Sequence, residues 1–176
     1  MSYLLNKLHW VEKSTKVSGL KLLAPASGEV QPIDNQAPDI FSCGMLGEGV
    51  AIALTGNKIT SPIKGIVTQV PGSAHRILLK ADNGLKIAIM LPPANQQLMG
   101  LGVKLNVQAG QKIQPGQQLA QFNLQQLQRH NPAEVQKLYL FITNAELIGK
   151  VVASQQKVTA AEDIVLTVTA KADSKK

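Results

Sequence analysis

The sequence predicts an all-β protein, an antiparallel β-sandwich or barrel with only short helical turns. Many short segments are rich in Val, Ile and Leu, and Gly, Pro, Ser or Asn bound most of them. Turn signals separate these segments throughout the chain, which is typical of antiparallel sheets. Stretches with helical periodicity are few and short.

The expected strands are 28–30, 50–54, 65–70, 76–80, 85–90, 112–113, 118–122, 138–142 and 164–168. Apolar residues alternate with others in 86–89 and in 165–168, so we expect each of these strands to bury one face. Short helices are expected over 94–99 and over 124–130, where Gly100 and Pro132 would end them.

Two turns are marked strongly. Asp82-Asn83-Gly84 separates two expected strands, and Asn and Gly tolerate the positive φ of tight hairpin turns. In Gln114-Pro115-Gly116, Pro fixes φ at the second position of a turn and Gly is free to go positive at the third.

One sequence pattern occurs twice. Ala24–Val30 and Ser61–Val67 share the order small-Pro-x-x-Gly-x-Val, in which Pro ends one extended segment and Gly permits the bend into the next. The pattern fits a quasi-repeated β-structure, and it also fits two similar turns that arose by chance.

Length and composition favour one domain in the cytoplasm. A chain of 176 residues buries one core, and it has no apolar run near the roughly 18 residues of a spanning helix. The N-terminus lacks the features of a secretory signal.

Cys43 is the only cysteine, which excludes an internal disulfide and a cysteine-rich zinc site. The charge of +7 is spread along the chain with few aromatics, which predicts a solvated basic surface and no nucleic-acid partner.

The N-terminal segment 3–11 could contact an anionic membrane. Leu4, Leu8 and Val11 recur at helical spacing, which fits a short amphipathic helix. A disordered leader fits the same residues equally well. The side chains that favour the membrane interface are Tyr3, Lys7 and Trp10.

Several segments, taken in order, carry a resemblance to a known family. They are Ala24–Glu29, Pro38–Ser42, Gly47–Ile52, Ser61–Gly65, His75, Asn83–Gly84, Ala109–Gln111 and Pro115–Gly116. From Leu22 to Val168 the chain resembles the glucose-type IIA component of the bacterial phosphoenolpyruvate sugar phosphotransferase system (PTS). The resemblance implies a β-sandwich of the duplicated hybrid motif type. The expected organisation is an amphipathic or flexible leader (1–18), the glucose-type IIA domain (19–170) and a disordered tail (171–176).

The resemblance also implies a site that this chain has altered. In the family one histidine takes a phosphoryl group from the carrier HPr and passes it to the IIB domain of a sugar permease, while a second histidine supports it. His75 matches the supporting histidine, and Met90 stands at the acceptor position. A thioether cannot take this role. The sequence therefore predicts a phosphorylation-incompetent, regulatory homologue and not an enzyme; the alternative is an active phosphocarrier that uses His75 or an unrecognised acceptor.

The resemblance further implies a surface for partners. Ile40, Phe41, Leu46 and Leu78 fall where the family presents an apolar patch, so HPr, permease IIB domains or other PTS-regulated targets are the expected partners. No cofactor is expected. No metal site is expected either, because one histidine alone is a poor ligand set for zinc. The motifs of lysostaphin-type peptidases and of biotinyl or lipoyl carriers, which share this kind of β-architecture, are missing.

Overall fold

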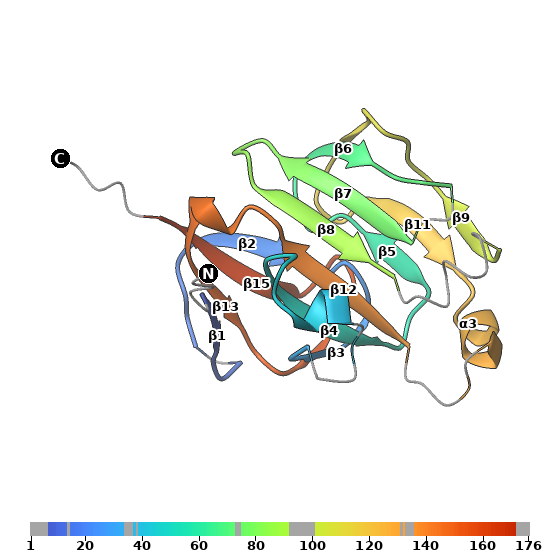
Figure 1. Cartoon of the computed structure of the whole chain (residues 1–176), viewed down its shortest axis with the longest axis horizontal. Helices are drawn as coiled ribbons and strands as arrows, with labels where there is room; N and C mark the ends of the chain where they lie inside the picture. Colours follow the sequence, from blue (N-terminus) through green and yellow to red (C-terminus); the bar gives the residue numbers. More distant parts are fainter. Residues whose placement is uncertain are drawn as a thin grey trace.

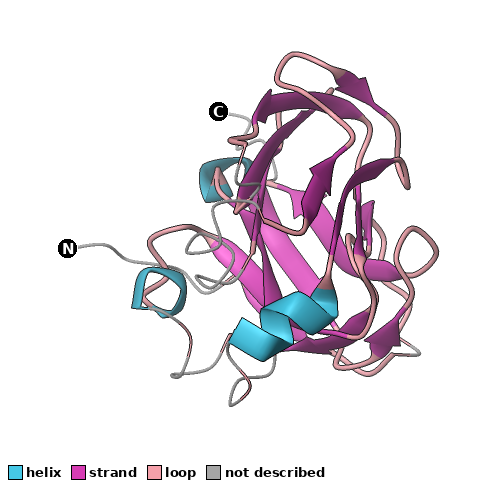
Figure 2. Ribbon diagram, turned by 90° about the vertical axis from the view of Figure 1, so that its right-hand side faces the viewer, coloured by secondary structure: helices cyan, strands magenta, loops and turns pink. Residues whose placement is uncertain are grey.

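The computed structural model describes residues 7–13, 15–33, 37, 39–72, 75–91, 101–130, 132 and 136–171. Its strands wrap around a common interior, and the helices lie at the periphery (Figures 1 and 2). The strands are β1 (Leu8–Trp10), β2 (Leu20–Leu23), β3 (Gly28–Gln31), β4 (Glu48–Leu54), β5 (Lys58–Thr60), β6 (Gly65–Gln69), β7 (Arg76–Ala81), β8 (Lys86–Met90), β9 (Val103–Leu105), β10 (Lys112–Ile113), β11 (Gln118–Phe122), β12 (Lys137–Ile142), β13 (Ile148–Ala153), β14 (Lys157–Val158) and β15 (Ile164–Ala170). The helices are α1 (Asp39–Ser42), α3 (Leu124–His130) and the 3-10 turn η1 (Ala145–Leu147).

Three sheets make up the fold. The largest has eight strands in the order β10-β6-β7-β8-β12-β4-β3-β14, and every neighbouring pair in it is antiparallel. A four-stranded sheet, β1-β13-β15-β2, and a three-stranded sheet, β5-β11-β9, complete the architecture. The antiparallel β-sandwich expected from the sequence is confirmed. Among the described residues, no helix is long and apolar enough to cross a membrane.

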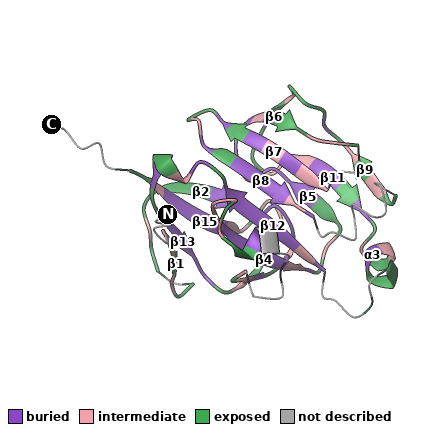
Figure 3. Cartoon of the chain, in the orientation of Figure 1, coloured by how far each residue is buried: buried purple, intermediate pink, exposed green. Residues whose placement is uncertain are grey.

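The main core lies between the sheets and follows the central strands, as the buried residues of Figure 3 show. The expectation that 86–89 and 165–168 bury only one face is wrong. Ala88, on the other face of β8, is only 3% exposed because a second apolar cluster covers it. All four residues from Val165 to Val168 are buried in β15, which is an inner strand of its sheet.

Every strand expected from the sequence forms, and so does the helix over 124–130. The sequence did not predict β1, β2, β5, β9, β13 or β14, most of which have four residues or fewer and lack clear alternation. The other expected helix, 94–99, lies outside the described residues, as does the tail 172–176.

The helical interpretation of the N-terminal segment is wrong for Leu8–Trp10. These residues form β1, which pairs in parallel with β13. The backbone amide of Val151 donates to the carbonyl of Lys7 at 2.8 Å, and the amide of Val11 donates to Ala153 at 2.8 Å. Pairing with a strand far along the sequence therefore decides the conformation here, and local periodicity does not.

The two Pro-Gly segments lie against each other. The amide of Thr60 donates to the carbonyl of Pro25 at 2.8 Å, and the amide of Leu23 donates to the carbonyl of Pro62 at 3.1 Å. Each segment then leads into a strand that begins at a glycine, Gly28 in β3 or Gly65 in β6. This reciprocal pairing supports the quasi-repeated β-structure over two unrelated turns.

Candidate functional site

The β7–β8 hairpin builds the candidate site. Its turn closes at Asp82-Asn83-Gly84, where Gly84 has a φ of 89° and the amide of Gly84 donates to the carbonyl of Ala81 at 2.9 Å. The Asn83 side-chain oxygen accepts from the amide of Leu85 at 3.1 Å. The hairpin expected from the sequence is confirmed, and this short turn fixes the register of the two strands.

That register brings His75 and Met90 together at the open end of the hairpin. Arg76 is the Cα partner of Met90, and the amide of Leu91 donates to the carbonyl of His75 at 2.8 Å. His75 and Met90 are each partly exposed. His75 directly precedes β7 and Met90 ends β8, so the two residues that the sequence singled out lie at the same end of the hairpin.

Burial lowers the pKa of His75 from its usual value, and the charge of neighbouring Arg76 lowers it further. The ring is therefore neutral near pH 7. A neutral imidazole carries one nitrogen that donates a hydrogen bond and one that accepts. It could support a bound group or act as a nucleophile, so its electrostatics alone do not choose between these roles.

Met90 belongs to the second apolar cluster, which covers the outer face of the eight-stranded sheet. Its partner across the other edge of β8 is Tyr139 of β12. Met90 has a thioether that packs here as a flexible apolar group and offers no nucleophilic nitrogen. The cluster consists of the buried residues Ala37, Phe41, Ala51, Ala88, Tyr139 and Phe141, with Ile33, Leu46, Leu78 and Met90 packed beside them.

The structure corrects one of the four residues expected in the partner patch. Phe41 is only 6% exposed, and its ring centroid lies 4.6 Å from that of Tyr139 and 5.8 Å from that of Phe141. It is a core residue that fixes α1 to the sheet. Leu46 and Leu78 are partly exposed at the margin of the same cluster, while the side chain of Ile40 lies outside the described residues.

Within the described part of the chain, no three His, Cys, Asp or Glu side chains come close enough to hold a metal ion. Cys43 is exposed. The hairpin therefore presents one histidine beside an apolar surface, and its described residues give no metal-binding set.

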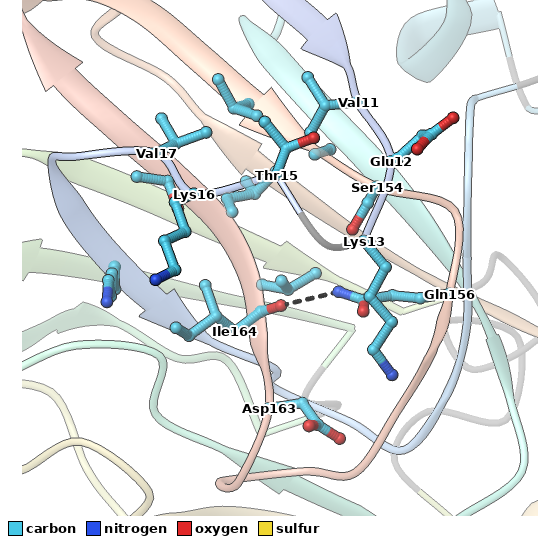
Figure 4. A pocket seen from close by; sticks show the side chains of 16 residues that line it. Val11, Glu12, Lys13, Thr15, Lys16, Val17, Ser154, Gln156, Asp163 and Ile164 are labelled. Atoms are coloured by element: carbon cyan, nitrogen blue, oxygen red, sulfur yellow. Dashed lines mark hydrogen bonds between the residues drawn. The ribbon is translucent and has the colours of Figure 1, made fainter.

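A separate cavity of about 470 Å³ lies along β13 and β15 (Figure 4). Lys13 and Lys16 are among its lining residues, and Gln156 donates from Nε2 to the carbonyl of Ile164 at 3.1 Å. Sequence reasoning missed this cavity because residues distant in sequence line it. Neither His75 nor Met90 contributes to its lining.

Comparison with known proteins agrees with the fold. The model of the family "phosphoenolpyruvate-dependent sugar phosphotransferase system, EIIA 1" matches residues 20–148. The chain is 30% identical over 151 residues to proteins named "PTS system glucose-specific EIIA component" from Staphylococcus aureus (strain COL) and Staphylococcus epidermidis (strain RP62A). Each alignment covers 85% of this chain and 90% of the relative. The solved structure of glucose permease IIA from Mycoplasma capricolum shares the fold, with a TM-score of 0.74, 22% identity, and coverage of 85% of this chain and 96% of the other.

Proposed function

Because the chain belongs to the EIIA 1 family of the phosphoenolpyruvate-dependent sugar phosphotransferase system, we propose that it is a divergent, phosphorylation-incompetent member. It acts by binding partners and so regulates them. The relatives named as glucose-specific EIIA components support a role for this chain in sugar transport. Its place of action is the cytoplasm.

One observation carries the proposal. Met90 occupies the strand position beside His75 where the family resemblance places the phosphoryl acceptor. Phosphoryl transfer depends on positioning a nucleophile in line with the phosphorus and on stabilising the charge of the phosphoryl oxygens. At this position Met90 supplies packing and no nucleophile. A histidine, His75, is still present at the position that the resemblance assigns to the supporting histidine.

HPr and the IIB domains of sugar permeases are the proposed partners. The binding surface is the outer face of the β7–β8 hairpin, with Leu78 and Met90 partly exposed on it and Leu46 at its margin. An apolar centre with a polar rim binds a protein without any catalysis. Bound in this way, the chain would occupy a partner that an active relative also uses.

The alternative function is active phosphocarriage through His75. The lowered pKa of His75 favours this reading, because a neutral ring has one unprotonated nitrogen, which is the nucleophilic form. Against it, the family resemblance assigns this position to support, and the structure shows no second histidine on the hairpin among the described residues.

Transfer of labelled phosphate tests the proposal. Phosphoenolpyruvate, enzyme I and HPr are incubated with the wild type, Met90→His and His75→Ala, with a glucose-type relative as positive control. We expect at least a hundredfold less label on the wild type than on the relative, because no acceptor lies beside His75. Label on the wild type that is lost in His75→Ala would establish the alternative. Label on Met90→His alone would show that the rest of the site is still competent.

A contact between residues 3–11 and anionic membranes stays a prediction. The structure weakens its basis, since Leu8 and Trp10 pack against the core. The Lys7 ammonium donates to the carbonyls of Ala145 and Ile148, the latter at 2.7 Å. Deleting residues 1–6 leaves β1 in place; if the contact exists, we expect binding to phosphatidylglycerol vesicles to fall at least threefold in a sedimentation assay. Equal binding of the deleted and full chains would reject the contact.

A further inference from the structure

A row of lysines extends from the outer face of the hairpin across the neighbouring strands. The structural role of these strands does not explain the row. Lys112 of β10 is the Cα partner of Ile66, Ile66 is the partner of Lys80, and Lys80 is the partner of Lys86. Partners in register point to the same side of a sheet. The three lysines are exposed, so they form a line across four adjacent strands.

The same face is apolar next to this row. Leu78 and Ala88 are Cα partners two positions along β7 and β8, and the next pair on this side is Arg76 and Met90. Arg76 Nε is buried without a hydrogen-bond partner among the described residues. The face therefore has an apolar centre between lysines at one end and an arginine at the other.

No acidic residue balances these cations within the four strands. The sequences of β6, β7, β8 and β10 contain no Asp or Glu. The nearby carboxylate, Asp82 at the hairpin tip, lies 3.5 Å from Lys64 Nζ and is thus already paired with a different cation. The charges of the exposed Lys80 and Lys86 therefore face outward.

Stability does not explain the row. Like charges placed directly opposite each other, as in the Lys80–Lys86 pair, destabilise an antiparallel pair of strands. Lysines do protect the open edge of a sheet from aggregation, which accounts for Lys112 on the edge strand β10. Strands β7 and β8 are interior strands, so edge protection does not account for Lys80 or Lys86.

We propose that this face, defined by Arg76, Leu78, Lys80, Lys86 and Met90, binds an acidic protein partner. Carboxylates of the partner would lie opposite the lysines, and an apolar side chain would pack on Leu78 and Met90. This inference rests on the proposed docking function of the hairpin and adds the chemistry of the partner. The lysine row alone would suit a nucleic acid or a lipid surface as well as a protein. The apolar centre beside it favours a protein.

The test uses a defined probe, a synthetic peptide with two leucines flanked by glutamates, and a matched peptide with lysines in place of the glutamates. Amide chemical shifts of the full chain locate the binding. We expect the acidic peptide to shift Leu78, Lys80, Lys86 and Met90, and the basic peptide to shift none of them. Raising the ionic strength tenfold should weaken the acidic complex at least fivefold.

Charge reversal assigns the effect to this face. Lys80→Glu/Lys86→Glu should raise the Kd for the acidic peptide at least tenfold. The matched control is Lys104→Glu/Lys150→Glu, which makes the same change in net charge at exposed positions of the other two sheets and should leave the Kd within twofold. All residues changed are exposed, and the amide spectra of both variants check that they stay folded before the Kd values are compared.

Three results would overturn the proposal. They are absence of shifts at the face, equal weakening by the two double variants, and equally strong binding of duplex DNA or phosphatidylglycerol vesicles to the same residues. None of these depends on phosphate transfer. Label on wild-type His75 would instead reject the proposed function while leaving the chemistry of the face as measured.

Discussion

A Gly65→Ala variant is expected to lose about 3 kcal/mol of unfolding free energy, near the top of the range for an overpacked site. Gly65 begins β6 and is the Cα partner of Ala81 in β7. A Cβ at this position would overlap the carbonyl oxygen of Lys80 and come within 2.9 Å of the Ala81 Cα. These are backbone atoms of the strand that holds the candidate site, so β7 would have to move away from β6.

Urea unfolding measures this loss, and Gly72→Ala is the matched control. Gly72 lies just after β6, and, apart from its chain neighbours, no atom of the described residues lies within 4 Å of the position that its Cβ would take. The control should therefore stay within about 0.5 kcal/mol of the wild type. If the two variants unfolded at the same urea concentration with equal slopes, the close packing of β6 on β7 would be refuted.

The site hairpin could be predicted from the sequence because its information is local. Asp82-Asn83-Gly84 specifies a tight turn, and the turn sets the register of the strands on both sides. Once the register is fixed, Arg76 lies opposite Met90, and His75, directly before Arg76, lies at the same end of the hairpin. The pattern shared by Ala24–Val30 and Ser61–Val67 could also be recognised in the sequence. Only the hydrogen bonds to the carbonyls of Pro25 and Pro62 distinguish a quasi-repeated structure from two turns that are similar by chance.

The burial of Phe41 and the strand β1 could not be predicted in this way. Phe41 stands in a four-residue helix, too short for any periodicity, and it is buried because α1 folds onto Tyr139 and Phe141 from a distant strand. Leu8–Trp10 becomes a strand because β13 supplies its partner. Both outcomes depend on contacts across most of the chain length, which patterning does not encode.

The row of Lys80, Lys86 and Lys112 could not be predicted from the sequence for a related reason. Lys80 and Lys86 are close in sequence, and the hairpin register predicts that they face each other. Lys112 joins them only through the order β10-β6-β7-β8, which the sequence does not specify. The net charge of +7 was visible from the start, whereas its concentration beside an apolar centre needed the sheet.

A Phe41→Ala variant is expected to destabilise the protein by about 3 kcal/mol or more, the usual cost of removing a buried phenylalanine ring. The ring is 6% exposed and packs on two aromatic rings, so its loss leaves a cavity beneath α1. Met45→Ala is the control, because Met45 follows closely in sequence and is 83% exposed. Its truncation should cost less than about 0.5 kcal/mol by urea unfolding.

This comparison also separates the two roles considered for Phe41. A residue of an exposed partner patch would cost little stability when truncated and would weaken partner binding directly. A core residue costs stability, and it affects binding only through the position of α1 and of the surface around Met90 and Leu78. Equal unfolding free energies for Phe41→Ala and Met45→Ala would show that Phe41 is a surface residue. A large difference would show that Phe41 is a core residue that supports the structure of the proposed binding face.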